Sequence, residues 1–204
     1  MDNPFDYKDI VRPPRALVDA LAKIGSATLS SELAQHLGIR DPQIRGPRPL
    51  VKGRTVAGPA LTLQCMPKRE DLYGAAEYEN PELQLHRHVL YPTQPGDVVV
   101  VDARGDLGSG IFGEMMLTFF GGRGGVGVVI DGCIRDSAHA AKLDLGVWVT
   151  GVTPNYHAQT NIIPFAVNVP IACGGVLIIP GDIIVADDDG AIVVRFETAK
   201  AAAE

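Results

Sequence analysis

The feature that most constrains the fold is a series of short apolar runs separated by helix-like segments in the second half of the chain. Apolar runs cover residues 98–102, 126–131 and 147–150, and segments with helical patterns at 111–120 and 137–145 lie between them. Runs of this length are typical of strands buried on both faces, and a strand–helix–strand order favours parallel pairing. The sequence therefore predicts an α/β fold built in layers.

The rest of the chain predicts further elements around this unit. Apolar residues recur at helical spacing between residues 15 and 24, and Gly25 ends that helix. Residues 1–14 are expected to form a short arm on a single domain that spans residues 1–204, and residues 66–80 are expected to form an exposed, charged excursion. The remaining predicted elements are a helix at 31–37, a strand at 56–65, a helix at 81–90, and two or three strands within 176–194.

One segment concentrates polar side chains that could form a site. The run at 126–130 leads into Asp131-Gly132-Cys133-Ile134-Arg135-Asp136, and Glu114 lies twenty-one residues before Arg135. Arg is a planar donor that binds carboxylates through paired hydrogen bonds, and Asp is a hard oxygen ligand suited to Mg²⁺. A glycine-rich segment at 105–114 lies upstream, and bare backbone amides can bind an anion. Together these parts predict a site for a small carboxylate held on a metal.

These residues also have ordinary structural interpretations. Arg135 and Asp136 could be a surface ion pair, with Asp136 as the N-cap of the following helix, and Glu114 could be a carboxylate stabilised by a helix N-terminus. Asp106 is expected to stabilise the glycine loop, and Asp131 is expected to be structural. The functional interpretation of Arg135 and Asp136 is favoured because the glycine segment accompanies them.

Composition argues against several classes of function. The net charge is −6, which disfavours a nucleic-acid partner because phosphate binding needs clustered Lys and Arg. The three cysteines, Cys65, Cys133 and Cys173, fit no zinc or disulfide pattern and suit a reducing cytoplasm. The acidic N-terminus predicts no signal peptide, and no apolar run approaches the length of a membrane span.

Two further patterns resemble known sites but lack the required context. Residues 122–127 fit G-x-G-x-x-G, but a predicted helix precedes them and a strand follows, which is the reverse of a dinucleotide fingerprint. Residues 187–190, Asp-Asp-Asp-Gly, lack the distal glutamate of a calcium loop and predict a hairpin turn. Structural roles are also expected for the histidines His86, His88, His139 and His157.

A tight-turn motif occurs twice. Pro95-Gly96-Asp97 and Pro180-Gly181-Asp182 each precede an apolar run, and they lie eighty-five residues apart. Pro-Gly-Asp favours a tight turn that begins a buried strand. The repeat fits either the same turn chemistry used twice or a structural duplication.

The glycine segment and the Arg-Asp motif together carry a resemblance to the RraA-like family, over roughly residues 20–195. The family motif is an acidic residue, twenty further residues, and then Arg-Asp, which this chain supplies with Glu114 and Arg135-Asp136. The family includes metal-dependent 4-hydroxy-4-methyl-2-oxoglutarate / 4-carboxy-4-hydroxy-2-oxoadipate aldolases. It also includes RraA, a protein regulator of ribonuclease E.

The resemblance implies a layered α/β/β/α fold assembled as a homotrimer or homohexamer, with sites near subunit contacts. It implies that Asp136 holds Mg²⁺ or Mn²⁺, partly through water, and that Arg135 binds the keto-acid end of the substrate. Glu114 would act in catalysis next to metal-bound water. The backbone amides implied to hold the substrate carboxylate are those around Leu107, Gly108, Ser109 and Gly110.

The expected reaction is cleavage of a 4-hydroxy-2-oxo dicarboxylic or tricarboxylic acid to pyruvate and a second 2-oxo acid. Negative charge grows on the former keto oxygen as pyruvate enolate forms, and a metal together with the Arg135 guanidinium would stabilise it. The other aldolase strategy uses a lysine Schiff base, but none of the six lysines lies between Pro95 and Asp136. Oxaloacetate decarboxylation forms the same enolate and is an expected side activity. The proton of the 4-hydroxyl would be taken by a side chain such as Glu114 or by bound water.

A second class of function stays open. The chain could be a non-catalytic regulator that binds a ribonuclease and keeps only a vestigial pocket. A regulator needs no metal ligand, so the presence of Asp136 favours the enzyme.

Overall fold

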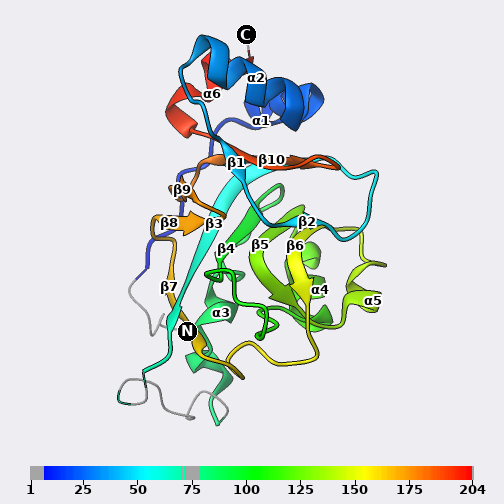
Figure 1. The fold of residues 1–204 in the computed structure, drawn as a ribbon, viewed down its shortest axis with the longest axis vertical. Helices are drawn as coiled ribbons and strands as arrows, with labels where there is room; N and C mark the ends of the chain where they lie inside the picture. Colours follow the sequence, from blue (N-terminus) through cyan, green and yellow to red (C-terminus); the bar gives the residue numbers. More distant parts are fainter. Residues whose placement is uncertain (1–6, 70, 72–78, 204) are drawn as a thin grey trace.

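The computed structural model describes residues 7–69, 71 and 79–203, which form four layers (Figure 1). The helical layer at one end contains α1 (Arg15–Ile24), α2 (Ser26–His36) and α6 (Ala199–Ala203). The strands beside it are β1 (Gln43–Ile44), β10 (Ile183–Asp187) and β11 (Gly190–Val194). The third layer contains β2 (Arg48–Pro49), β3 (Val56–Pro67), β4 (Val98–Asp102), β5 (Gly127–Ile134) and β6 (Gly146–Val152). The helices on its far side are α3 (Leu85–His88), α4 (Glu114–Gly122) and α5 (Ser137–Ala140). The predicted α/β/β/α layering is confirmed.

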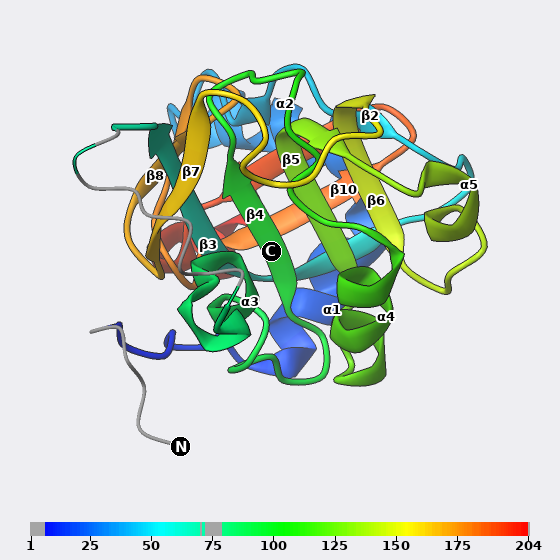
Figure 2. The same cartoon turned by 90° about the horizontal axis from the view of Figure 1, so that it is seen from below.

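The long strand β3 belongs to both sheet layers. Its first residues pair antiparallel with β10, and the residues from Ala60 to Gln64 pair in parallel with β4. β4, β5 and β6 continue the parallel arrangement, which confirms the predicted pairing. Figure 2 looks onto this layer and shows β3, β4, β5 and β6 side by side in that order. The elements that complete the chain are η2 (Pro81–Leu83), β7 (Ile162–Val167), β8 (Ile171–Cys173), β9 (Val176–Ile178) and η3 (Phe196–Thr198).

Three apolar clusters fill the spaces between the four layers. Side chains alternate along a strand, so β4 sends Val98 and Val100 into the cluster between the sheets and Val99 into the cluster beneath α4. β10 divides its side chains in the same way, with Ile184 between the sheets and Ile183 against α1 and α2. Burial on both faces explains why these strands are continuous apolar runs.

The two Pro-Gly-Asp motifs form the same turn. Gly96 and Gly181 have φ of 95° and 94°, which glycine adopts without a Cβ clash. The Asp97 and Asp182 carboxylates each accept the backbone N–H three residues earlier, at 2.8 and 2.9 Å. One turn begins β4, which is parallel to β3, and the other begins β10, which is antiparallel to it. The repeat is therefore one turn chemistry used at two places that differ in pairing.

The predicted helix at 111–120 is wrong at its start. α4 begins at Glu114, because the residues before it run as an extended segment beside the end of β5. It ends at Gly122, and β5 starts at Gly127, so the G-x-G-x-x-G stretch connects a helix to a strand as predicted.

Other element boundaries differ for reasons outside the local sequence. α2 begins at Ser26, five residues before the predicted start, because the Asp187 carboxylate accepts the Ser26 N–H at 2.7 Å. The expected helix at 81–90 is divided into η2 and α3, because Gln84 has an extended conformation. The helix predicted at 137–145 is shortened to the four residues of α5. Most of the expected excursion at 66–80 lies outside the described residues, and its first two residues belong to β3.

Candidate functional site

The end of the glycine segment lies directly against the Arg-Asp motif. The Ile111 N–H donates to the Cys133 carbonyl at 3.0 Å, and the Arg135 N–H donates to the Phe112 carbonyl at 3.0 Å. A Cβ on Gly110 would lie 3.1 Å from the Cβ of Arg135, so the two backbones approach as closely as a glycine permits. Two segments that are more than twenty residues apart in sequence are thereby brought together, as the motif predicted.

Asp136 has a backbone conformation that turns its side chain toward α4. Its φ and ψ are 57° and 34°, in the left-handed region that Asp tolerates better than most residues. It precedes α5 but makes no side-chain capping bond to that helix. Its Oδ2 instead accepts the Glu114 N–H at 3.2 Å and lies 3.8 Å from Nε of Arg135. Asp136 therefore occupies the N-cap position of α5, but its side chain does not cap that helix. Asp136 and Arg135 present half-exposed side chains beside each other.

Gly113 leaves the space that this pair occupies. A Cβ at this position would lie 2.5 Å from Oδ2 of Asp136 and 2.9 Å from Nε of Arg135. Glu114 follows as the first residue of α4 and is exposed; its backbone N–H binds Asp136. The Asp136 carboxylate therefore lies against the backbone from which the Glu114 side chain extends.

The glycine loop itself is held by Asp106. Its Oδ2 accepts the N–H groups of Gly108 at 3.1 Å and Ser109 at 2.7 Å. The Thr160 hydroxyl lies 3.3 Å from both Asp106 oxygens and 2.5 Å from the Ser109 hydroxyl. Asp106 therefore stabilises the loop, as expected. Two of the four amides predicted to hold a carboxylate already have an acceptor, so that prediction now depends chiefly on Leu107 and Gly110.

The donor set around Asp136 suits a cation that keeps much of its water. Among the described residues, no three His, Cys, Asp or Glu side chains gather as a ready-made metal cage. Asp136 is half exposed, and Oδ2 alone makes a hydrogen bond within this part of the chain. Mg²⁺ is commonly bound through one or two carboxylates and keeps several of its waters. A single accessible carboxylate therefore suits Mg²⁺ better than an ion that needs many protein ligands.

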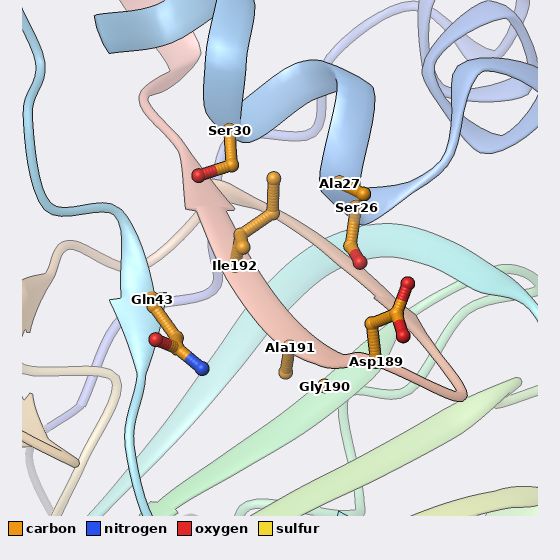
Figure 3. A pocket seen from close by; sticks show the side chains of 8 residues that line it. All are labelled: Ser26, Ala27, Ser30, Gln43, Asp189, Gly190, Ala191 and Ile192. Atoms are coloured by element: carbon orange, nitrogen blue, oxygen red, sulfur yellow. The ribbon is translucent and has the colours of Figure 1, made fainter.

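Two hollows contain polar side chains that could form a site. The hollow beside the motif is lined by Arg135, Asp136, Ser137, Ala138, His139, Val152, Thr153 and Pro154. Another lies between the N-terminus of α2 and the β10–β11 hairpin, where Ser26 and Asp189 approach each other (Figure 3). That hairpin is the turn predicted at 187–190, and its Asp187 is used to cap α2. The first hollow is therefore the candidate site.

Buried side chains around the motif have supporting roles. Asp131 accepts the N–H groups of Ala103 at 2.5 Å and Gly174 at 3.2 Å, which makes it a structural link, as expected. Burial raises the pKa of the Asp131 carboxyl to about 6. Burial also raises the pKa of the Cys133 thiol, which lies 3.5 Å from the Leu107 carbonyl and is therefore not poised as a nucleophile.

Two histidines that were expected to have structural roles form a buried pair. His86 of α3 and His157 of the β6–β7 connection stack with ring centroids 3.7 Å apart and an interplanar angle of 26°. Both rings are buried. The pair is joined across seventy-one residues of sequence, and no local pattern indicates it.

Comparison with known proteins identifies the family of the chain. The sequence profile of the RraA-like family, described as Aldolase/RraA, matches residues 16–193. The chain belongs to the RraA-like family. The residues matched include every member of the Arg-Asp motif and the glycine segment.

Relatives of both functional kinds occur within the RraA-like family. A protein of Halalkalibacterium halodurans, provisionally named a 4-hydroxy-4-methyl-2-oxoglutarate aldolase, is 37% identical over 147 residues. That match covers 72% of this chain and 63% of the relative, so the chain spans less than two thirds of the relative's length. The crystal structure of Streptomyces coelicolor RraAS2, titled an unusual member of the RNase ES inhibitor RraA protein family, has 44% identity. Its TM-score is 0.85, with 95% of this chain and 91% of that chain covered.

A more distant RraA-like structure supports the fold alone. The RNA-processing inhibitor RraA from Thermus thermophilis is 24% identical, with a TM-score of 0.62 over 81% of this chain and 91% of that chain.

No helix in the described part of the chain is long and apolar enough to span a membrane.

Proposed function

We propose that this chain is a divalent-metal-dependent aldolase. Its substrate is a 4-hydroxy-2-oxo dicarboxylic or tricarboxylic acid, which it cleaves to pyruvate and a second 2-oxo acid, with oxaloacetate decarboxylation as a side activity. The named aldolase relative supports this class of reaction. The observation that carries the proposal is the Asp136 side chain, which is turned away from its own helix and held beside Arg135.

The residues divide the chemistry between them. Asp136 would hold Mg²⁺ or Mn²⁺, and a bound divalent cation supplies positive charge where the enolate oxygen develops. The Arg135 guanidinium binds the 2-oxo acid end and meets the same developing charge. Backbone amides of the glycine loop would orient the carboxylate. Glu114, exposed at the first turn of α4, would order water beside Asp136; its backbone N–H donates to that carboxylate.

The proposal also covers the oligomeric state of the protein and its cellular location. We infer a homotrimer or homohexamer, with sites near subunit contacts, that works in the cytoplasm on a small 2-oxo acid. The three described cysteines are all free and buried, which suits a reducing compartment.

The test is pyruvate release from 4-hydroxy-4-methyl-2-oxoglutarate and from oxaloacetate, coupled to lactate dehydrogenase. Mg²⁺ should restore the activity that EDTA removes, and Asp136→Ala should lower kcat at least about 100-fold. Asp144→Ala is the matched control, because this carboxylate is fully exposed and pairs only with Arg54 among the described residues. Full activity in excess EDTA, with substrate trapped by borohydride, would overturn the metal mechanism.

A regulator of ribonuclease activity is the second candidate. It is favoured by the 44% identity to RraAS2. Tight binding to a ribonuclease of the E class that persists in Asp136→Ala, with no pyruvate formed from either substrate, would select this function over the enzyme.

A further inference from the structure

One nitrogen of the buried His86 imidazole, Nδ1, lacks a hydrogen-bond partner among the described residues. The residue is only 3% exposed. A buried polar atom without a partner destabilises the fold, so such an atom in a folded protein calls for an explanation. A ligand or an ordered water that reaches this nitrogen would remove the destabilisation.

The surroundings of His86 connect it to the candidate site. Its stacking partner His157 lies in the β6–β7 connection. The same connection holds the glycine loop, since the Asn155 amide donates to the Gly108 carbonyl at 2.8 Å and Thr160 contacts Ser109. The charge of Arg135 is also close enough to act on the His86 ring. His86 is therefore linked to the candidate site through the β6–β7 connection, and its ring lies in the field of the Arg135 charge.

The charges facing His86 keep its ring neutral. Arg87 and His88 act on it from α3, His157 from the β6–β7 connection, and Arg135 from the end of β5. Burial is the largest cause that lowers the pKa of His86, and these four groups lower it further. An anionic substrate on Arg135 would offset one of these positive charges and make protonation of the ring easier.

We propose that His86 takes the proton of the substrate's C4 hydroxyl during aldol cleavage, directly or through one water. This inference rests on the proposed aldolase function. As the proton moves to the imidazole, the C4–O bond becomes a carbonyl and the C3–C4 bond breaks. Its electron pair forms the C2–C3 double bond of pyruvate enolate, whose negative oxygen faces Arg135. Protonation of C3 then gives pyruvate, and the imidazolium returns its proton to water.

The two expected reactions differ in their need for this base. Oxaloacetate has no C4 hydroxyl, and loss of its C4 carboxylate as carbon dioxide leaves the same enolate. A variant without the base should therefore lose aldol cleavage and keep decarboxylation. A residue that merely supports the fold or orients Arg135 would affect both reactions together.

The experiment measures kcat for both reactions in the Mg²⁺-loaded full chain with His86→Asn. We expect aldol cleavage of 4-hydroxy-4-methyl-2-oxoglutarate to fall about 100- to 1000-fold and decarboxylation to change less than about 3-fold. The acidic limb of the pH profile should also disappear from the residual aldol activity. His36→Asn is the control, because His36 is exposed on α2 and far in sequence from the motif.

Three results would overturn the proposal. Equal losses in the two reactions, with folding confirmed by circular dichroism, would make His86 a structural residue. Unchanged aldol cleavage would exclude it as the base. A wild-type chain that cleaves no 4-hydroxy-2-oxo acid would refute the aldolase function and this inference with it, which separates that failure from the other two. If His86→Asn does not fold, His86→Gln is measured in its place under the same criteria.

Discussion

At the scale of single residues, backbone conformations that non-glycine residues rarely adopt occur at the candidate site. Arg104 and Asp136 are two of the three non-glycine residues with positive φ in the described structure. Arg104 directly precedes the glycine segment, and Asp136 contacts the end of that segment at Glu114. A residue in this region costs of order 1 kcal/mol or more, and such residues gather at functional sites. The position of the Asp136 carboxylate is thus maintained at the expense of local stability.

Gly113→Ala should impair activity more than stability. The φ and ψ of Gly113, −116° and −178°, suit alanine, so the added methyl acts only through its contact with Asp136 and Arg135. Both side chains are half exposed and can move aside. We expect kcat/KM to fall at least about 10-fold, while urea unfolding changes the free energy of unfolding by less than about 1 kcal/mol.

Gly121→Ala is the control for that substitution. It lies in the same helix, α4, and an added Cβ meets nothing within 4 Å. Alanine should leave activity unchanged and stabilise the helix by up to about 1 kcal/mol. Similar losses of activity in both variants would show that the Gly113 contact is not the cause.

At the scale of elements, what could be predicted depended on the range of the interactions involved. The bounds of α1 follow from local apolar spacing and Gly25, and the parallel strands follow from continuous apolar runs. The start of α2 depends on Asp187, more than 150 residues away, and the late start of α4 depends on the backbone of β5. Neither Asp187 nor β5 lies in the sequence window from which the helix start is predicted, so the local pattern could not indicate these starts.

The same limit applies to the site. Arg135, Asp136 and the glycine segment could be predicted to meet because a recognisable motif links them. The His86–His157 stack could not, since it joins a one-turn helix to an irregular connection. The two-residue strands β1 and β2 were also missed, because their pairing is determined by β11 and β6.

The N-terminal arm should contribute strongly to stability through one ion pair. Arg12 donates to both oxygens of Asp97, at 2.8 to 3.2 Å, and Asp97 is 1% exposed in the turn that begins β4. Arg12→Met would leave that carboxylate buried without its cation, so we expect a loss of about 3 kcal/mol in the free energy of unfolding. Denaturant unfolding monitored by Trp148 fluorescence checks this.

A double variant separates the ion pair from the packing of the arm. Arg12→Met with Asp97→Asn should be more stable than Arg12→Met alone, because no unpaired charge remains. Asp19→Asn is the comparison, since it removes an exposed partner of Arg15 and should cost less than about 1 kcal/mol. Simple additivity of the Arg12 and Asp97 changes would contradict the proposed coupling.

At the scale of the whole molecule, Asp131 should make stability depend on pH. Its pKa is raised in the folded state to about 6, so the protonated form is favoured by folding. The corresponding stability is fully present below the unfolded pKa of about 4 and is lost as pH rises through about 6. Relative to Asp131→Asn, the wild type should gain about 1 kcal/mol between pH 7.5 and pH 5.

The comparison with Asp131→Asn isolates this group from the rest of the molecule. The low pKa of His86 acts in the opposite direction, because its protonation in acid favours unfolding, but it is common to both proteins. The difference in unfolding free energy at each pH therefore reports Asp131. A difference that stays constant from pH 5 to pH 7.5 would mean that the carboxyl titrates normally.

The sharing of β3 between two sheet layers has a consequence for synthesis on the ribosome. Val56 of β3 pairs with Ala186 of β10, so about 130 residues must be translated before that half of the strand meets its partner. At ordinary rates of translation this interval is roughly 7 to 26 seconds. Throughout it the nascent chain carries an open, apolar strand edge, which is the kind of surface that associates with other chains. Protection of the growing polypeptide is therefore needed most before residue 186 has left the exit tunnel.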